Sequence, residues 1–145
     1  MKVRFEIKTQ MLGHGQNLEK EGKILNRILR VTEKGWEYEA DQRHGEIIVQ
    51  AMGLACAKGV SSPGEESKHW QEDEDEKLLG PNLSSEYRAI AARANFLAMD
   101  RPDIQYPVKE ICRAMSNPTV GDKKKLKRLA RYLLQVRMLV SHFEF

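Results

Sequence analysis

Three successive stretches with helical periodicity occupy the C-terminal half of the sequence, and they constrain its fold more than any other feature. Apolar residues recur every three or four positions across residues 87–98, 104–115 and 126–134. Pro102 and Pro118 separate the stretches, and proline is disfavoured inside a helix. Amphipathic helices bury their apolar sides against one another. The sequence therefore predicts a three-helix bundle over residues 84–137.

The ends of these helices carry recognisable capping residues. Ser84 or Ser85 can cap the first helix, Asp103 the second and Thr119 the third, which should run to about residue 136. Pro107 is compatible with the second helix because it falls in the first turn. The predicted buried positions are Tyr87, Ile90, Ala91, Ala94, Leu97 and Ala98 in the first helix, Ile104, Val108, Ile111, Cys112 and Met115 in the second, and Leu126, Leu129, Ala130, Leu133 and Leu134 in the third.

The N-terminal part of the chain alternates between apolar and polar residues, which is typical of strands. Residues 2–8 predict one strand, and residues 23–32 and 36–40 predict a hairpin that turns at Glu33-Lys34-Gly35. Within the hairpin, Leu25, Leu29 and Val31 can share one face. Asp41 is then expected to cap a helix that Gly59 ends, with apolar positions 47, 48, 51, 52 and 55. Residues 138–145 alternate again and predict a short terminal strand.

A polar, acidic segment separates the two halves. Residues 65–76 hold seven acids against Lys68, and proline and glycine flank the segment on both sides. Such a composition favours a flexible linker. The predicted fold class is α+β in four parts: strands, hairpin and helix over 1–59, the acidic linker over 60–83, the helical region over 84–137, and the start of a strand over 138–145.

Charge is segregated on the last predicted helix. Residues 119–137 contain seven Lys and Arg residues but only one acid, Asp122. On a helical wheel the apolar residues fall within an arc of roughly 140°, and most of the bases lie opposite. A dense basic face favours partners that carry phosphates, although a solvated helix face is the alternative interpretation. The candidate nucleic-acid-binding residues are Lys123, Lys124, Lys125, Lys127, Arg128 and Arg131.

Catalytic and metal-binding constellations are not predicted. Cys56 and Cys112 lie far apart, and Cys56 has no orienting group that would make it a nucleophile with His44. Asp73 and Asp75 fall in the flexible acidic run, which cannot preorganise a metal site. No apolar run approaches the length of roughly 18 residues that a membrane span needs, and the N-terminus does not have the pattern of a signal peptide. We therefore expect an intracellular protein of the cytoplasm or nucleus, with no membrane partner.

The helical half resembles a known family. The run YRAIAARANFLAMDRPDIQYPVKEICRAMSNPT (87–119), followed by KKLKRLARYL (124–133), resembles the stretch after the polymerase core in copia-type LTR retrotransposon Pol polyproteins. The family pattern combines a Tyr-Arg start, an Arg-Pro-Asp-Ile turn, a Met-Ser-Asn-Pro-Thr helix stop and a Lys-Arg-x-x-Arg-Tyr-Leu basic helix. All four elements are present here in that order. FEIKTQMLG (5–13), the hairpin and Ser-Ser-Pro-Gly (61–64) resemble the preceding segments of the family.

This resemblance implies a fragment of the reverse transcriptase region, from the end of the palm into a thumb-like helical region. It implies binding to an RNA or DNA template–primer duplex and attachment to the remainder of the Pol polyprotein. The family's Tyr-x-Asp-Asp turn lies upstream of the matched region and its ribonuclease H carboxylates lie downstream. The chain is therefore expected to hold no complete active site and no cofactor, because the two Mg²⁺ ions belong to the full polymerase.

The hairpin is expected, on the same resemblance, to lie on the primer side. Its candidate residues are Arg27, Arg30, Trp36 and Tyr38. Trp36 and Tyr38 can stack on bases, but packing across the hairpin explains them equally well. The alternative to the polymerase fragment is a decayed or domesticated module without enzymatic activity that binds nucleic acid or a protein partner.

Overall fold

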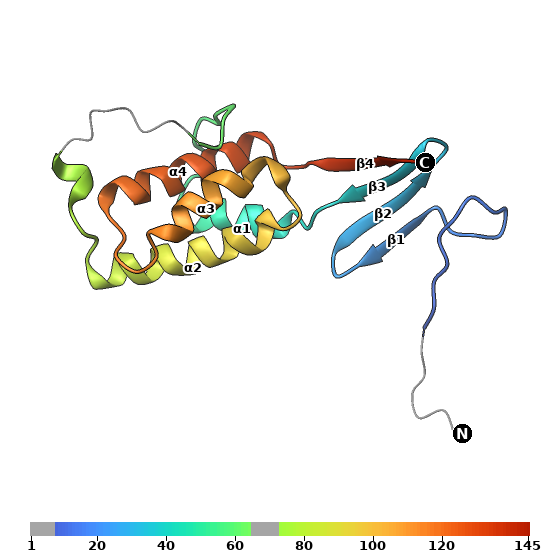
Figure 1. The fold of residues 1–145 in the computed structure, drawn as a ribbon, viewed down its shortest axis with the longest axis horizontal. Helices are drawn as coiled ribbons and strands as arrows, with labels where there is room; N and C mark the ends of the chain where they lie inside the picture. Colours follow the sequence, from blue (N-terminus) through green and yellow to red (C-terminus); the bar gives the residue numbers. More distant parts are fainter. Residues whose placement is uncertain (1–7, 65–72) are drawn as a thin grey trace, which may run out of the picture. The chain divides into compact units, whose positions relative to one another are not determined.

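A computed structural model describes residues 8–64 and 73–145 of the chain. The polypeptide forms two compact units (Figure 1). One contains the chain up to Ala40 together with Val140–Phe145 and is a β-sheet, and the other contains Asp41–Leu139 and is helical. The predicted α+β class is confirmed. Helix α1 groups with the later helices, whereas the predicted 1–59 segment placed it with the strands.

Over the residues that the structure describes, the sheet is an antiparallel meander of four strands in the order β1-β2-β3-β4. Its strands are β1 (Glu21–Ile24), β2 (Arg27–Thr32), β3 (Gly35–Glu39) and β4 (Val140–Glu144). The predicted hairpin is confirmed as β2 and β3, in which Val31 lies opposite Trp36. The predicted terminal strand is confirmed as β4, and it pairs with β3 so that Trp36 also lies beside Phe143. Two segments more than a hundred residues apart therefore share this sheet.

The first strand of the predicted hairpin is not continuous. Leu25 and Asn26 have φ values of 50° and 64° and form a two-residue turn between β1 and β2. Positive φ at both central positions is the signature of a type I′ turn, which matches the twist of the flanking strands. Leu25 is 77% exposed in this turn, so it does not share a buried face with Leu29 and Val31 as predicted. The strand predicted at 2–8 lies outside the described residues, except for Lys8, which is in coil.

The turn at Leu25-Asn26 leads to a prediction about stability. An L-residue other than Gly, Asn or Asp loses roughly 1 kcal/mol in the left-handed region, so the double variant Leu25→Asn/Asn26→Gly should stabilise the sheet by about that amount. Urea denaturation of both proteins, followed by tryptophan fluorescence, would measure the difference. Leu25→Ala is the control, because it removes the exposed side chain but keeps the backbone strain. A double variant no more stable than Leu25→Ala would contradict the explanation.

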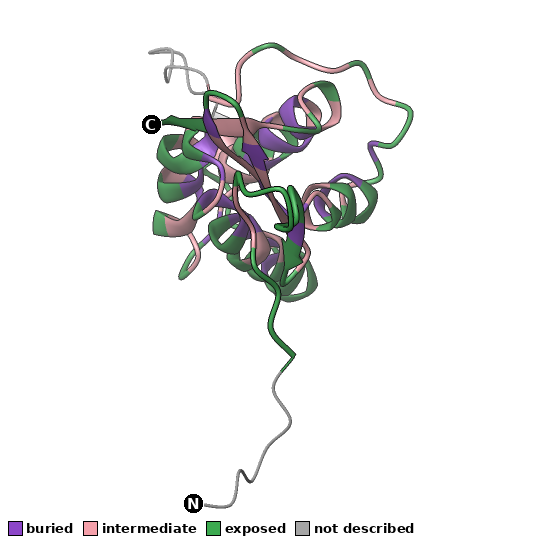
Figure 2. Cartoon of the chain, turned by 90° about the vertical axis from the view of Figure 1, so that its right-hand side faces the viewer, coloured by how far each residue is buried: buried purple, intermediate pink, exposed green. Residues whose placement is uncertain are grey.

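In its described residues, the helical unit has four α-helices and two short 3₁₀ turns. They are α1 (Arg43–Ala51), the turn η1 (Asp73–Glu76), α2 (Pro81–Ala98), the turn η2 (Pro102–Ile104), α3 (Gln105–Arg113) and α4 (Val120–Gln135). Helix α1 packs against both α2 and α4, so the bundle has one more helix than the sequence predicted. Buried positions lie on the inward sides of the helices (Figure 2). The largest fully buried side chains are those of Tyr87, Ile48, Ile104, Ile111, Leu126, Leu129 and Val108.

Helix α1 is shorter than predicted. It ends at Ala51, and Gly53, with a φ of 66°, lets the chain leave the helix. The predicted end at Gly59 is therefore wrong. The buried side of α1 carries Ile48 and Val49, while Ile47 is 40% exposed.

The later helices follow the predicted apolar positions closely. Helix α2 begins at Pro81, three residues before the first predicted cap, because proline suits the first turn of a helix. Tyr87 is buried in α2, and its hydroxyl donates to the carbonyl of Ile111 at 2.7 Å, which ties α2 to α3. Asp103 does not cap α3 as predicted, since its carboxylate accepts hydrogen bonds from Arg101 and Tyr132 instead.

Candidate nucleic-acid interface

Asp122, the single acidic residue of helix α4, takes part in the cap at the start of the helix. Thr119 and Asp122 form a capping box, in which the Thr119 hydroxyl accepts from the Asp122 amide at 3.2 Å and the Asp122 carboxylate accepts from the Thr119 amide at 3.1 Å. The same carboxylate lies 3.0 Å from Lys125 Nζ. Burial acts to raise the pKa of Asp122, but the hydrogen bonds from Lys125 and Thr119 outweigh it and leave that pKa lowered. The predicted cap at Thr119 is confirmed, and the rest of α4 carries bases without acids.

The predicted basic residues of α4 do not all lie on one side of the helix. Leu126, Leu129, Ala130 and Leu133 are buried in the core, as expected for the apolar side. At 100° per residue, Lys124, Lys127, Arg128 and Arg131 fall on one strip opposite that core. Lys123 and Lys125 lie on either side of the strip. We call Lys124, Lys127, Arg128 and Arg131 the basic strip.

An acidic turn packs against the N-terminal end of the basic strip. Asp75, in η1, lies 2.6 Å from Lys124 Nζ, and its backbone and side chain approach Gly121. The neighbouring backbone is tied down, because the amide of Val120 donates to the carbonyl of Lys77 at 2.9 Å. The last part of the predicted flexible linker is thus held against α4. The earlier acids of the run, residues 65–72, lie outside the described residues.

A loop from the first half of the chain packs against the C-terminal part of the basic strip. Arg131 Nε donates to the carbonyl of Lys58 at 2.7 Å, and the amide of Val60 donates to the carbonyl of Arg131 at 3.3 Å. Gly59 lies so close to Gln135 that a side chain at position 59 would collide with it. Residues 58–60 therefore run along the outer side of α4. The sequence alone does not indicate that Lys58 or Asp75 lies beside α4, because both contacts join segments that are far apart in the chain.

The four residues predicted for the primer side are divided between the two faces of the sheet. In an antiparallel sheet, residues directly opposite each other point to the same side. The registers place Arg27, Trp36 and Tyr38 on one face and Arg30 on the other. Arg30 lies 2.7 Å from the carboxylate of Glu21 and 2.8 Å from that of Glu39, one on each neighbouring strand. The charge of Arg30 is therefore compensated within the sheet.

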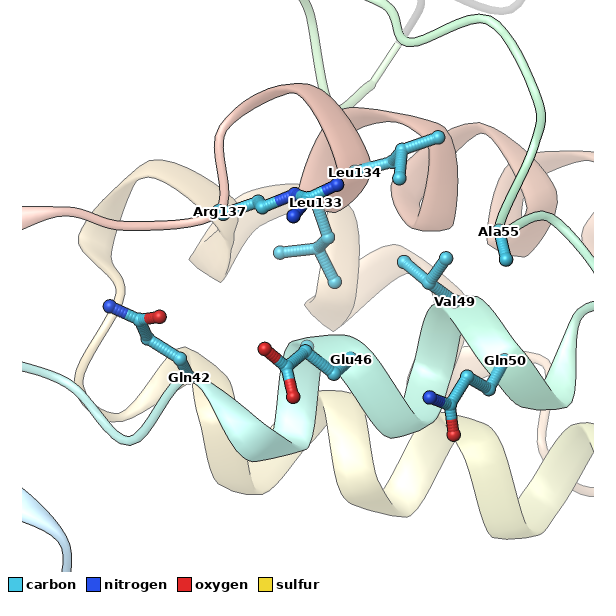
Figure 3. A pocket seen from close by; sticks show the side chains of 9 residues that line it. Gln42, Glu46, Val49, Gln50, Ala55, Leu133, Leu134 and Arg137 are labelled. Carbon is cyan, nitrogen blue, oxygen red and sulfur yellow. The ribbon is translucent and has the colours of Figure 1, made fainter.

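A pocket of about 210 Å³ opens between α1 and the end of α4 (Figure 3). Val49, Leu133 and Leu134 supply its apolar part. Its polar lining comes from Gln42, Glu46, Gln50 and Arg137. The two charged side chains, Glu46 and Arg137, come from opposite walls, and the pocket is lined by neither histidine nor cysteine.

Three further observations concern the chemistry of the described residues. In that part of the chain, no three His, Cys, Asp or Glu side chains are grouped so that they could hold a metal ion. Cys56 is exposed and Cys112 is half-buried, both as free thiols, and burial raises the pKa of Cys112. None of the helices described is long and apolar enough to cross a membrane.

Comparison with known proteins relates the chain to retrotransposons. It is 38% identical over 86 residues to a retrovirus-related Pol polyprotein from transposon RE1 of Arabidopsis thaliana, an alignment that covers 59% of this chain and 6% of the polyprotein. It is 31% identical over 94 residues to the corresponding polyprotein from transposon RE2 of the same plant, covering 65% of this chain and again 6% of the relative.

A third relative is an uncharacterized mitochondrial protein of Arabidopsis thaliana, 41% identical over 49 residues, or 34% of this chain and 20% of that protein. No protein-family model and no solved structure matches the chain. The chain spans only a small part of each of these relatives. The resemblance to copia-type retrotransposons is confirmed, and the chain is homologous to a segment of a retrotransposon Pol polyprotein.

Proposed function

We propose that the chain is part of the reverse transcriptase region of a copia-type Pol polyprotein and that it binds the template–primer duplex rather than catalysing polymerisation. On this proposal the catalytic carboxylates and their Mg²⁺ ions belong to other parts of the polyprotein, which are also its covalent partners. The homology to retrotransposon Pol polyproteins supports the origin. The duplex-binding role depends on the helical unit.

The observation that carries the proposed role is the charge distribution of α4. The apolar side of the helix is committed to the core, and Asp122 is committed to the cap. The outer side carries the basic strip at the spacing of successive helical turns, with Asp75 beside its first residue and residues 58–60 beside its last, and the strip can follow a row of phosphates. Each phosphate neutralised by such a residue releases counterions, which gives binding without sequence preference and with a steep dependence on salt.

We expect the full chain to bind an RNA–DNA hybrid duplex and a DNA duplex of any sequence, with affinity that falls steeply between low and physiological salt. Replacing Lys123, Lys124, Lys125, Lys127, Arg128 and Arg131 together by glutamine should weaken this binding on the order of a hundredfold at low salt and flatten the salt dependence. Fluorescence anisotropy with labelled duplexes would measure both quantities. Circular dichroism would establish that the variant keeps its helices.

A control comes from bases outside α4. Replacing Lys23, Lys34 and Lys109 by glutamine removes three positive charges, half as many as the six substitutions in α4, and leaves the basic strip intact. We expect this variant to lose affinity only slightly. Binding that ignored salt, or that survived the six substitutions in α4, would contradict the proposed function.

A second function is favoured by one of the relatives. The mitochondrial relative is named as a protein in its own right and not as a polyprotein, although it shares a similar segment. A domesticated module without enzymatic activity, bound to nucleic acid or to a protein partner, would account for this. The anisotropy experiment separates the protein-binding form of this alternative from the first proposal, because that form predicts no duplex binding.

A further inference from the structure

We propose that Lys58 belongs to the duplex-binding surface and contacts the phosphate backbone beside Lys127 and Arg131. This inference rests on the proposed function of α4. It adds a residue from the loop between α1 and the acidic segment, which the charge pattern of α4 cannot indicate. It also places the centre of the duplex-binding surface at the C-terminal part of the basic strip.

The loop is fixed to α4 by its backbone. Leu54 is buried in the helical core, and the amide of Ala57 donates to the carbonyl of Leu54 at 2.9 Å. From this anchor the chain reaches α4, where the Lys58 carbonyl accepts from Arg131 and the Val60 amide donates back to Arg131. Glycine at position 59 permits the close approach to α4. The position of the Lys58 backbone is therefore set on both sides of the residue.

The hydrogen bond between Arg131 and the loop does not neutralise the positive charge of Arg131. Its Nε donates to a backbone carbonyl, which is neutral, and the side chain of the residue that supplies this carbonyl is itself a cation. An exposed lysine beside an arginine raises the local positive potential and opposes folding slightly through like-charge repulsion. A phosphate placed between the two residues would remove that repulsion. Lys58 is exposed, so its ammonium group can reach a ligand.

The N-terminal end of α4 has the opposite character. The carboxylate of Asp75 lies against Lys124, and that of Asp122 lies against Lys125. A phosphate would have to compete with these carboxylates. The favoured phosphate path therefore runs over Lys127, Arg131 and Lys58, and less over residues 123–125.

The test compares single substitutions in the full chain by fluorescence anisotropy with a labelled RNA–DNA hybrid duplex. Lys58→Gln should weaken binding roughly three- to tenfold and reduce the slope of log K against log salt by about 0.9, the loss of one phosphate contact. Lys127→Gln should have a similar effect, and Lys58→Arg should bind like the original chain. Lys109→Gln, an exposed lysine on α3, is the matched control and should change little.

The outcomes separate this inference from the function on which it rests. If Lys58→Gln binds like the original chain while Lys127→Gln is weakened, the assignment of Lys58 is wrong and the proposed function of α4 survives. If the original chain shows no salt-dependent binding, both are wrong. A thermal melt of Lys58→Gln that matches the original would exclude a loss of fold as the cause of weaker binding.

Discussion

Replacing Arg101 by alanine is expected to lower the free energy of unfolding of the helical unit by about 3–5 kcal/mol, a large part of the stability of a small domain. Arg101 is 2% exposed and joins two distant parts of the unit. Its guanidinium donates to both carboxylate oxygens of Asp103, at 2.9 and 2.7 Å. It also donates to the carbonyls of Val136 and Arg137, which follow the end of α4, at 3.1 and 3.4 Å.

The size of the expected effect follows from what alanine would leave behind. The carbonyls of Val136 and Arg137 lie just past the end of α4, where the helix no longer supplies donors, and Arg101 donates to both. Asp103 would lose its counter-charge and keep the Tyr132 hydroxyl, 2.8 Å from its carboxylate, and a backbone hydrogen bond. A half-buried carboxylate without its counter-charge and carbonyls without donors both destabilise the folded state. Urea denaturation followed by circular dichroism would measure the change.

The acid dependence of stability provides the control for this cluster. Burial acts to raise the pKa of Asp103, but the hydrogen bonds from Arg101 and Tyr132 outweigh it and hold that pKa below its ordinary value. The contribution of the cluster is therefore complete above the ordinary carboxyl pKa of about 4 and is lost as the pH falls through the lower folded value. Asp103→Asn should remove this part of the acid sensitivity. The stabilising role proposed for Arg101 and Asp103 would be contradicted if Arg101→Ala were as stable as the original chain. It would also be contradicted if the stability of Asp103→Asn kept its full dependence on acid pH.

The helices of the C-terminal half could be predicted from the sequence because their information is local. Each apolar stripe repeats within one helix, and the capping box at Thr119 is complete within four residues. The same logic fails at Leu25, because this apolar residue is not typical of a turn and Asn26 alone does not mark one. An Asn-Gly pair would have marked it.

The contacts that shape the interface are not local and could not be predicted. Arg131 and Lys58 are 73 residues apart, and Asp75 comes from a segment whose composition indicated a flexible linker. The sequence predicted which residues of α4 are basic, but not which of them face a carboxylate and which face a carbonyl. That distinction depends on how the loop and the 3₁₀ turn pack. On the proposed function, it decides which end of α4 a phosphate would favour.

The role of Arg101 shows the same limit. The sequence indicates a turn at Arg101-Pro102-Asp103, and a cap is the role that it predicts for Asp103. A cap and a buried ion pair require the same residue type, and only the position of α4 decides between them.

Replacing Gly35 by valine is expected to detach β4 from the sheet, at a cost of about 2–3 kcal/mol to the sheet unit. Valine has a higher intrinsic preference for strands than glycine, so propensity alone predicts the opposite sign. Gly35 has a φ of 157°, and a Cβ at this position would collide with the carbonyl oxygen of Phe143 on β4. That atom belongs to the backbone of the neighbouring strand and cannot move without breaking the pairing between Gly35 and Glu144.

Hydrogen exchange resolved by residue would test this expectation. In Gly35→Val the amides of β4 should lose most of their protection, while the pairing of β1 with β2 should be less affected, since β3 lies between. Glu37→Val is the matched control, because it adds the same side chain to the same strand and face, where the original residue already has a Cβ. We expect it to keep β4 protected. Equal protection of β4 in both variants would show that the strand shifts to accommodate a Cβ at position 35, and the close approach to Phe143 would then not be what holds the C-terminal strand in this register.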